Sequence, residues 1–244
     1  MQKNWLRFTA FLLMFCGIAG CFSFSSIRSF RFNSTTEAAP AWTVVLDAGH
    51  GGEDGGAVSA SGIYEKDVNL SITLKLHELL RANGISVVLT RSEDILLYDR
   101  TVDYHGRKKA LDLAARRKIA EETPNCVFVS IHLNAFPQTQ YSGLQVWYSQ
   151  NTPSSLTLAQ TIQHMTAEHL QLQNNRRVKL ATSSIYLLHH LQCPAILVEC
   201  GFLSNPEEAA LLSTEEYQNK LAFLLFLAIS DEITKISPEF TANP

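Results

Sequence analysis

The sequence predicts an α/β fold, a single three-layer domain in which a largely parallel, twisted sheet carries helices on both faces. Beyond Pro40, short apolar segments rich in β-branched residues alternate with longer segments of helical periodicity. The apolar segments are nearly continuous, which is typical of parallel strands buried on both faces. Hydrophobic residues make up 46% of the chain and charged residues 18%, enough apolar material for one substantial core.

The elements follow from local patterns. Trp42 to Asp47 is a β-branched run that ends in a Gly-rich turn, which predicts a buried strand. Lys66 to Ala82 places its apolar residues at helical spacing, and Asn83-Gly84 ends this helix. The same criteria predict strands at Ile85–Leu89, Val127–Ile131, Leu144–Tyr148 and Ala195–Val198, and helices at Leu111–Glu122, Ser154–Gln171 and Thr214–Ile236. Asn205-Pro206 has the pattern of a helix N-cap followed by proline at the first helical position.

A leader precedes the domain. Lys3 and Arg7 come before an uncharged, mostly apolar run from Phe8 to Phe22, which is short for an ordinary membrane span. We therefore predict that residues 1–31 are a signal peptide or membrane anchor, residues 32–41 a linker and residues 42–237 the main folded domain. Ile18 to Cys21 (IAGC) also resembles a lipoprotein processing box, which would make Cys21 a lipidated N-terminus. Cleavage, lipidation and retention all place the domain across a membrane.

Charge and cysteine content exclude some classes. The net charge is -3 and no basic block occurs, so no nucleic-acid partner is expected. Three cysteines lie outside the leader, and an odd number is not a disulfide framework. Cys193 and Cys200 flank one predicted strand, about 23 Å apart, and cannot pair. Cys126 and Cys193 each precede a buried strand and could be neighbours, but we expect all three to be small buried apolar residues.

Metal-binding residue types follow three of the predicted strands. His50, His132 and Glu199 each come at or just after a strand's carboxyl end, and in such sheets functional residues gather at that edge. Catalytic zinc typically takes three protein ligands and leaves a position for water, so one more carboxylate is needed. Glu53 forms an H-x-x-E pattern with His50, whereas Glu65 stands at a helix start, where the helix dipole favours a carboxylate. Spacing leaves both open.

Four segments in order carry a family resemblance. They are Val45–Ala57 (VLDAGHGGEDGGA), Gly62–Leu70 (GIYEKDVNL), Ser130–Ala135 (SIHLNA) and Ala195–Glu208 (AILVECGFLSNPEE). With these the chain resembles the zinc-dependent N-acetylmuramoyl-L-alanine amidases, or amidase type 3, over essentially the whole domain. The resemblance implies hydrolysis of the amide between N-acetylmuramic acid and L-alanine in peptidoglycan. It also implies that His50, Glu65 and His132 bind Zn²⁺ and that Glu199 is the catalytic base.

Finer features point to a subgroup. The short N-terminal membrane segment, the HGGEDGGA loop and the long segment from Ser92 to Lys109 resemble the germination-specific amidases of the spore cortex. That implies an extracytoplasmic enzyme, secreted or membrane-anchored, facing the cell wall or cortex, and leaves open whether a protein activator is needed. Two departures stand out. Ala48 and Gly56 occupy positions where many members have proline, and His189-His190 stand where an arginine is common.

For several residues the sequence is compatible with two alternative roles. Asp47 either orients a zinc ligand or hydrogen-bonds the Gly-rich loop, Asn134 contacts substrate or closes a turn, and Arg116 supports the site wall or faces solvent. A rival function is a zinc carboxypeptidase or endopeptidase that uses Glu53 in place of Glu65. Arg176 and Arg177 would then grip a terminal carboxylate. A catalytically silent wall-binding protein on the same fold is the second rival.

Overall fold

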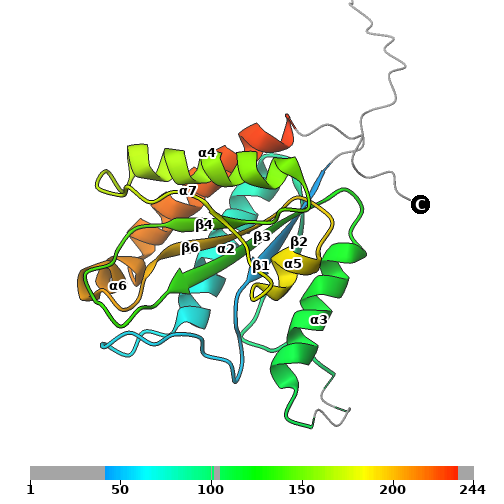
Figure 1. The fold of residues 1–244 in the computed structure, drawn as a ribbon, viewed down its shortest axis with the longest axis horizontal. Coiled ribbons are helices and arrows are strands. Elements are labelled where there is room, and N and C mark those ends of the chain that lie inside the picture. The colour runs from blue at the N-terminus through cyan, green and yellow to red at the C-terminus, as the bar shows by residue number, and fades with distance from the viewer. Residues whose placement is uncertain (1–41, 100, 102–104, 236–244) are drawn as a thin grey trace, which may run out of the picture. The chain divides into compact units, whose positions relative to one another are not determined.

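The structure, a computed structural model, describes residues 42–99, 101 and 105–235 (Figure 1). The predicted leader, the linker up to residue 41 and the predicted helix end at Ile236 lie outside the described residues. The strands are β1 (Thr43–Ala48), β2 (Ser86–Leu89), β3 (Cys126–Asn134), β4 (Gln145–Tyr148), β5 (Lys179–Leu180) and β6 (Ala195–Phe202). The helices are α2 (Glu65–Ala82), α3 (Lys108–Glu121), α4 (Pro153–His169), α5 (Tyr186–His190), α6 (Pro206–Leu212) and α7 (Glu215–Ile233).

The strands form one six-stranded sheet in the order β2-β1-β3-β6-β4-β5. β2, β1, β3 and β6 are mutually parallel. β4 runs antiparallel to β6, and β5 is parallel to β4, so the sheet is mixed at one edge. The predicted α/β domain with a largely parallel sheet is therefore confirmed.

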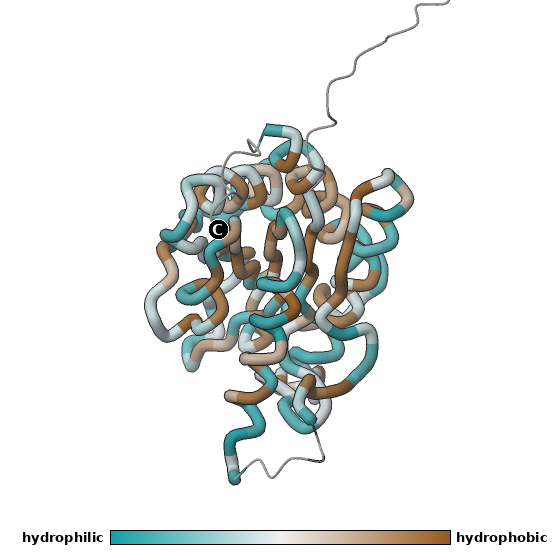
Figure 2. Tube along the Cα trace, turned by 90° about the vertical axis from the view of Figure 1, so that its right-hand side faces the viewer, coloured by the Kyte–Doolittle hydropathy of each residue, from teal (hydrophilic) through white to brown (hydrophobic). Residues whose placement is uncertain are grey.

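Helices cover both faces of the sheet. On one face α2, α4 and α7 pack together over side chains such as Val44, Val129 and Val198. On the other face α3 and α5 cover a smaller cluster around Val45 and Phe128. Consecutive residues of β1 thus enter opposite cores, which explains its continuous apolar run. Apolar stretches (brown) run through the strands, and more polar loops surround them (Figure 2).

The strands extend further than their apolar runs predicted. β3 continues past Ile131 to Asn134, and β6 continues past Val198 to Phe202. His132 and Glu199 consequently lie within the strands, directly opposite each other in the β3–β6 register. The backbone ladder continues through these polar residues, which hydropathy alone does not reveal.

The remaining elements differ in small ways from prediction. The N-cap prediction at Asn205 is confirmed, since its side chain accepts hydrogen bonds from the backbone N–H groups of Glu207 and Glu208. β5 and α5 were not predicted, because elements of two and five residues are too short to show periodicity. Cys126 and Cys200 are buried as expected, whereas Cys193 is partly exposed. None of the helices in the described part of the chain combines the length and apolar character that a bilayer crossing requires.

Candidate metal centre and active site

The segment from Ala48, the last residue of β1, to Ala57 is called the glycine loop. Its glycines make room for other side chains. A Cβ atom on Gly49 would lie 2.2 Å from Nε2 of His132, and one on Gly56 would lie 2.5 Å from Oε2 of Glu65. Both distances are far inside van der Waals contact, so only glycine fits at these two positions. His50 itself has a φ of 61°, a left-handed conformation that is uncommon outside glycine. The loop thereby delivers the imidazole of His50 to the side chains of β3 and α2.

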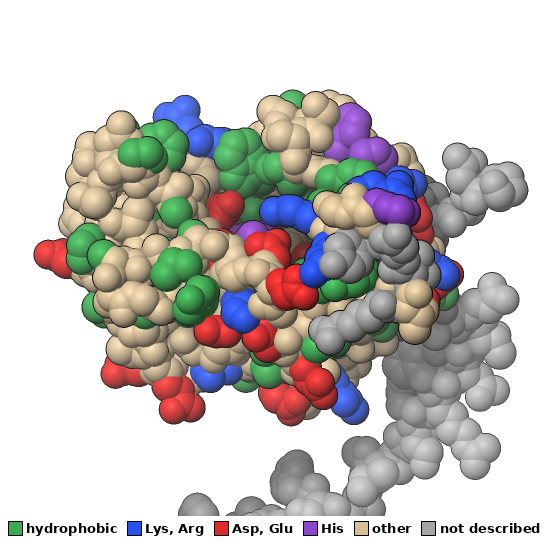
Figure 3. Space-filling view, turned by 90° about the horizontal axis from the view of Figure 1, so that it is seen from below, with side chains coloured by type: hydrophobic (Ala, Val, Ile, Leu, Met, Phe, Trp, Pro, Cys, Tyr) green, Lys and Arg blue, Asp and Glu red, His purple; other side chains and the backbone are tan. Residues whose placement is uncertain are grey.

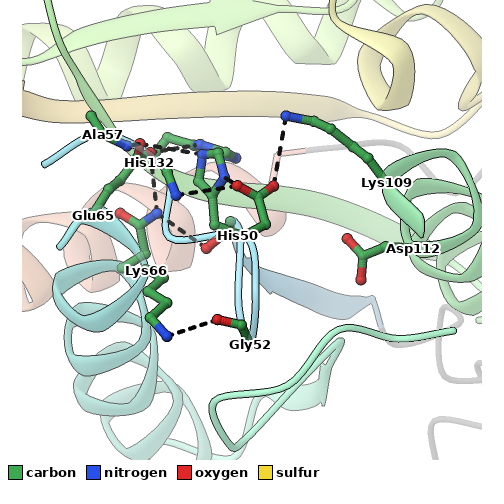
Figure 4. Close-up of polar contacts among 12 residues, drawn as sticks. His50, Gly52, Ala57, Glu65, Lys66, Lys109, Asp112 and His132 are labelled. Atoms are coloured by element: carbon green, nitrogen blue, oxygen red, sulfur yellow. Dashed lines mark hydrogen bonds and ion pairs between the residues drawn. The ribbon is translucent and has the colours of Figure 1, made fainter. Parts of the chain in front are cut away.

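His50, Glu65 and His132 converge on one point (Figure 4). The Glu65 carboxylate lies between the two rings, with Oε2 3.2 Å from His50 Nε2 and Oε1 3.0 Å from His132 Nδ1. One ligand atom from each residue lies within 4.8 Å of the others, and among the described residues these three form the group that could hold a metal ion. Two imidazoles and one carboxylate are the donor set that catalytic zinc sites use.

Glu53 does not join this cluster. Its side chain is 65% exposed and pairs with Lys108 at the start of α3. Of the two candidate carboxylates, the one that lies beside both histidines is therefore Glu65, in the first turn of α2. This arrangement also gives no support to the carboxypeptidase reading, which needed Glu53 at the metal.

Glu65 is a buried carboxylate held by several donors. It is 3% exposed and accepts hydrogen bonds from the backbone N–H groups of Ala57 (2.9 Å) and Leu133 (3.0 Å) and from the Asn69 amide (3.3 Å). Burial would raise the pKa of Glu65, but hydrogen bonds and charge from His132 and His50 hold it well below its ordinary range. Glu65 is thus ionised at neutral pH, as a metal ligand must be.

His50 has a second acidic neighbour. Asp54 Oδ1 lies 2.9 Å from its Nδ1, an ion-pair distance without the alignment of a hydrogen bond. Burial acts to lower the pKa of His50, but Glu65 and Asp54 together raise it above the ordinary value. A carboxylate behind the far nitrogen of a histidine is the usual way in which a metal-binding ring is oriented.

Glu199 stands beside the cluster without belonging to it. It is the β6 residue opposite His132, and its Oε2 atom is buried without a hydrogen-bond partner among the described residues. Burial raises the pKa of Glu199 to about 7. A carboxyl group with a pKa near neutrality can both accept and return a proton at physiological pH.

A cavity of about 410 Å³ opens over Glu199 and His132 on the α3 and α5 side of the sheet. Lys109 and Asn134 are among the polar residues that line it. Most of its wall is apolar or aromatic and consists of Leu113, Trp147, Ile185, Tyr186, Leu187, Leu188 and Leu197. Figure 3 shows the domain from below relative to Figure 1, and in this view histidine (purple) and charged side chains (red, blue) gather around a hollow. His189 and His190 do not line this cavity.

Two buried arginines hold the backbone of the glycine loop. Arg116, 1% exposed, donates to the carbonyl oxygens of Ala48 and His50, both at 2.7 Å. Arg91, 2% exposed, donates to the carbonyl oxygens of Ala48 (2.8 Å) and Gly49 (3.0 Å). Of the two readings of Arg116, support of the site wall is correct. No role of Arg91 was predicted.

The charge of Arg116 is balanced by two buried carboxylates. It donates to Asp47 (2.6 Å) and to Asp112 (2.7 Å), four residues earlier on α3. Asp47 also accepts from the hydroxyl groups of Thr90 and Ser130. Asp47 therefore hydrogen-bonds neither a histidine of the cluster nor the loop itself, and both predicted roles of this residue were wrong. It acts on the loop through Arg116, which hydrogen-bonds both.

Comparison with known proteins agrees with this geometry. Residues 44–231 match the family described as N-acetylmuramoyl-L-alanine amidase (Amidase_3). The chain belongs to this family. It is 33% identical over 229 residues to the germination-specific N-acetylmuramoyl-L-alanine amidase of Bacillus subtilis, covering 94% of this chain and 95% of that protein.

Two solved amidase structures are similar to the domain. One is the CwlD amidase from Clostridioides difficile, solved in complex with the GerS lipoprotein, with a TM-score of 0.75 and 40% identity over 80% of this chain and all of that one. The other is the catalytic domain of CwlV from Paenibacillus (Bacillus) polymyxa, with a TM-score of 0.68 and 32% identity over 79% and 98% of the two chains.

This amidase is accordingly a hydrolase of peptidoglycan, with the activity of an N-acetylmuramoyl-L-alanine amidase and relatives that act in spore germination. The His50–Glu65–His132 cluster is of the kind that holds a metal in this family. The resemblance stated from four sequence segments is thereby confirmed. The alternative hypothesis of a catalytically silent wall-binding protein is therefore not supported.

Proposed function

We propose that this amidase uses Zn²⁺ held by His50, Glu65 and His132, with Glu199 as general base and acid, to cleave the amide between N-acetylmuramic acid and L-alanine. One observation carries the proposal. The donor set of His50, Glu65 and His132 lies beside Glu199; within it Glu65 is buried and both histidines are partly exposed. The Oε2 atom of Glu199 is buried and has no hydrogen-bond partner among the described residues. Unpartnered buried polar atoms are rare in folded proteins and call for a functional explanation.

The roles of the side chains follow from their environments. Bound zinc supplies Lewis acidity, which activates water near neutral pH and polarises the scissile carbonyl. Glu199 accepts a proton from the attacking water and returns it to the departing amine of L-alanine, so the C–N bond breaks without releasing an amide anion. A pKa of about 7 suits both transfers, because the carboxyl group is then poised between its two forms. Glu65 stays ionised and keeps both imidazoles turned towards one point.

We further propose that the enzyme works outside the cytoplasm on spore-cortex peptidoglycan, delivered by residues 1–31 as a signal peptide or membrane anchor. The similarity to a germination-specific amidase over 94% of the chain supports this setting. The similar CwlD amidase was solved with a lipoprotein, which supports a protein partner for this chain as well. Membrane attachment of such a partner or of the leader would hold the domain close to its substrate.

The zinc and base assignments are tested with three isosteric variants of the full chain, Glu199→Gln, Glu65→Gln and Glu53→Gln. Zinc content is measured by elemental analysis, and fragments released from purified peptidoglycan by mass spectrometry. Glu199→Gln should keep its zinc and lose turnover by about 10²–10⁴-fold. Glu65→Gln should lose both, and the exposed Glu53→Gln should lose neither. Full activity of a zinc-loaded Glu199→Gln enzyme, or zinc retention by Glu65→Gln, would refute the assignment.

A further inference from the structure

A pair of free thiols lies at the opposite end of the sheet from the metal-binding cluster. The Sγ atoms of Cys126 and Cys193 are 3.4 Å apart although the residues are 67 positions apart in the chain. The two residues stand two positions before Phe128 and Ala195, which are paired in the β3–β6 register. The N–H of Phe128 donates to the carbonyl of Pro194 at 2.8 Å and fixes this end of the ladder.

We propose that Cys126 and Cys193 form a disulfide bond once the domain is in an oxidising compartment. A disulfide needs an S–S distance of about 2.05 Å and Cα atoms about 4.4–6.8 Å apart. Neighbouring strands lie about 4.7–4.9 Å apart, and Cys126 and Cys193 each stand two residues before a paired residue of β3 and β6, so we expect their Cα atoms to fall in that range. The sulfur atoms then have to approach by little more than 1 Å, which a small side-chain rotation achieves. The proposal does not depend on the zinc chemistry.

The reaction balances as an exchange with a second disulfide. The two S–H bonds of Cys126 and Cys193 break, one S–S bond forms between them, and two protons and two electrons leave. The electrons reduce the disulfide of a thiol–disulfide oxidoreductase, or of oxidised glutathione in the test tube, to two thiols. Exchange runs through a mixed disulfide on one of the two cysteines, which the other cysteine then displaces.

The order of events follows from exposure. Cys126 is 4% exposed, and its hydrogen bond with Cys193 together with burial raises its pKa, so it reacts poorly with reagents in solution. Cys193 is partly exposed, and both cysteines line a cavity of about 380 Å³ that Trp42 and Pro194 also border. A small disulfide therefore reaches Cys193 first, and the adjacent Cys126 completes the exchange.

The disulfide would link β3, which carries His132, to the segment just before β6, which carries Glu199. Cys126 lies six residues before His132 on β3, and Cys193 lies six residues before Glu199. A link at this end stabilises the β3–β6 register without touching the site. By closing a long loop of chain it also restricts the unfolded state, which is the main source of disulfide stabilisation.

The test compares oxidised and reduced full-length enzyme. The native protein is incubated with oxidised glutathione, free thiols are alkylated, and unreduced peptides are mapped by mass spectrometry. We expect a Cys126–Cys193 cross-linked peptide two hydrogens lighter than the two thiol peptides, with Cys200 alkylated after unfolding. Loss of this bond on reduction should lower Tm by about 5–15 °C, with little change in peptidoglycan hydrolysis.

Variants identify the pair and keep the test decisive. Cys200→Ala should retain the redox-dependent change in Tm, because among the described residues this buried thiol donates to the carbonyl of Val198, at 3.9 Å, and contacts neither of the other two cysteines. Cys193→Ala and Cys126→Ala should abolish it. If the buried Cys126 variant does not fold, Cys193→Ala and the wild-type peptide map still decide. Full alkylation of both cysteines in the oxidised native protein, or a cross-link involving Cys200, would overturn the proposal.

Discussion

Replacing Arg116 with methionine would remove the cation at the centre of a buried polar network. The guanidinium makes four hydrogen bonds of 2.6–2.7 Å, two to the carboxylates of Asp47 and Asp112 and two to backbone carbonyls of the glycine loop. The side chains of Arg116, Asp47 and Asp112 are 2%, 1% and 5% exposed, so water cannot replace the lost partner. Removing one partner of a buried ion pair costs about 3–5 kcal/mol, because a charge remains buried without compensation.

The remaining donors limit the loss to that range. Thr90 and Ser130 still donate to Asp47, and the N–H of Leu97 still donates to Asp112. A loss of about 3–5 kcal/mol is a large part of the stability of an ordinary domain. With a urea m-value of about 3 kcal/mol/M, the unfolding midpoint should fall by about 1–2 M at unchanged m. Urea unfolding followed by circular dichroism measures both quantities.

Arg117→Met is the matched control. Arg117 is the next residue of α3, but its side chain is 33% exposed and pairs with Glu121 at the surface. The same substitution there should leave the midpoint nearly unchanged, because exposed ion pairs contribute little. If the two variants unfold at the same urea concentration, Arg116 does not organise a buried network and the reasoning fails.

The pH dependence provides a second signature of the same network. Burial would raise the pKa of Asp47, but Arg116, Ser130 and Thr90 hold it below the ordinary value of about 3.9. A carboxylate with a depressed folded pKa contributes stability above its unfolded pKa and loses it as the pH falls through the folded pKa. The stability difference between wild type and Arg116→Met should therefore be full at pH 7 and narrow below about pH 4. A difference that stays constant down to pH 3 would mean that charge pairing is not its origin.

Three further predictions concern the site and its supports. Gly49→Ala should lose metal and activity, because its Cβ would lie 2.2 Å from the His132 ring. Gly84→Ala is the control, since the space around its new Cβ is open. This control should lose some stability but bind metal normally when a chelator competes for the metal. Asp54→Asn should weaken metal binding about 10–100-fold by loosening His50, with the exposed Glu53→Gln as control in the same competition. Glu208→Ala should lower the free energy of unfolding in urea by about 1–3 kcal/mol, since it leaves the N–H groups of Gly143 and Phe202 buried and unpaired. Replacement of the adjacent, exposed Glu207 by alanine should leave this free energy nearly unchanged.

The strand-end residues could be predicted from sequence because long apolar strands are readable and their carboxyl ends meet at one edge. That reasoning brought His50, His132 and Glu199 together correctly. Glu65 could not be chosen over Glu53 in this way, because the choice depends on how the chain folds back after β1. The N–H of Glu65 donates to the carbonyl of Ala57 at 2.9 Å, and that of Lys66 donates to Gly55 at 3.2 Å. These are tertiary contacts with no periodic signal.

The buried arginines were hidden for a different reason. Hydropathy patterns assign Arg91 and Arg116 to the surface, and burial of an arginine becomes favourable only when carboxylates and carbonyls surround it. Part of the signal was present, since Asp112 and Arg116 stand at i, i+4 spacing on one helix. The other partner, Asp47, lies 69 residues away on β1 and becomes visible only in the folded chain.

The metal-binding geometry depends on residues without side chains as much as on the ligands. His50, Glu65 and His132 come from a loop, a helix and a strand, and such side chains meet only if the intervening backbone can approach them closely. Gly49 admits the His132 ring and Gly56 admits the Glu65 carboxylate, while Arg91 and Arg116 hold the carbonyls of the same loop. A histidine with a φ of 61° is tolerated because four hydrogen bonds of these arginines to the loop carbonyls oppose relaxation of the loop. The conformation of the glycine loop, rather than the presence of two histidines and a glutamate in the sequence, is therefore what brings these three side chains to one point at this edge of the sheet.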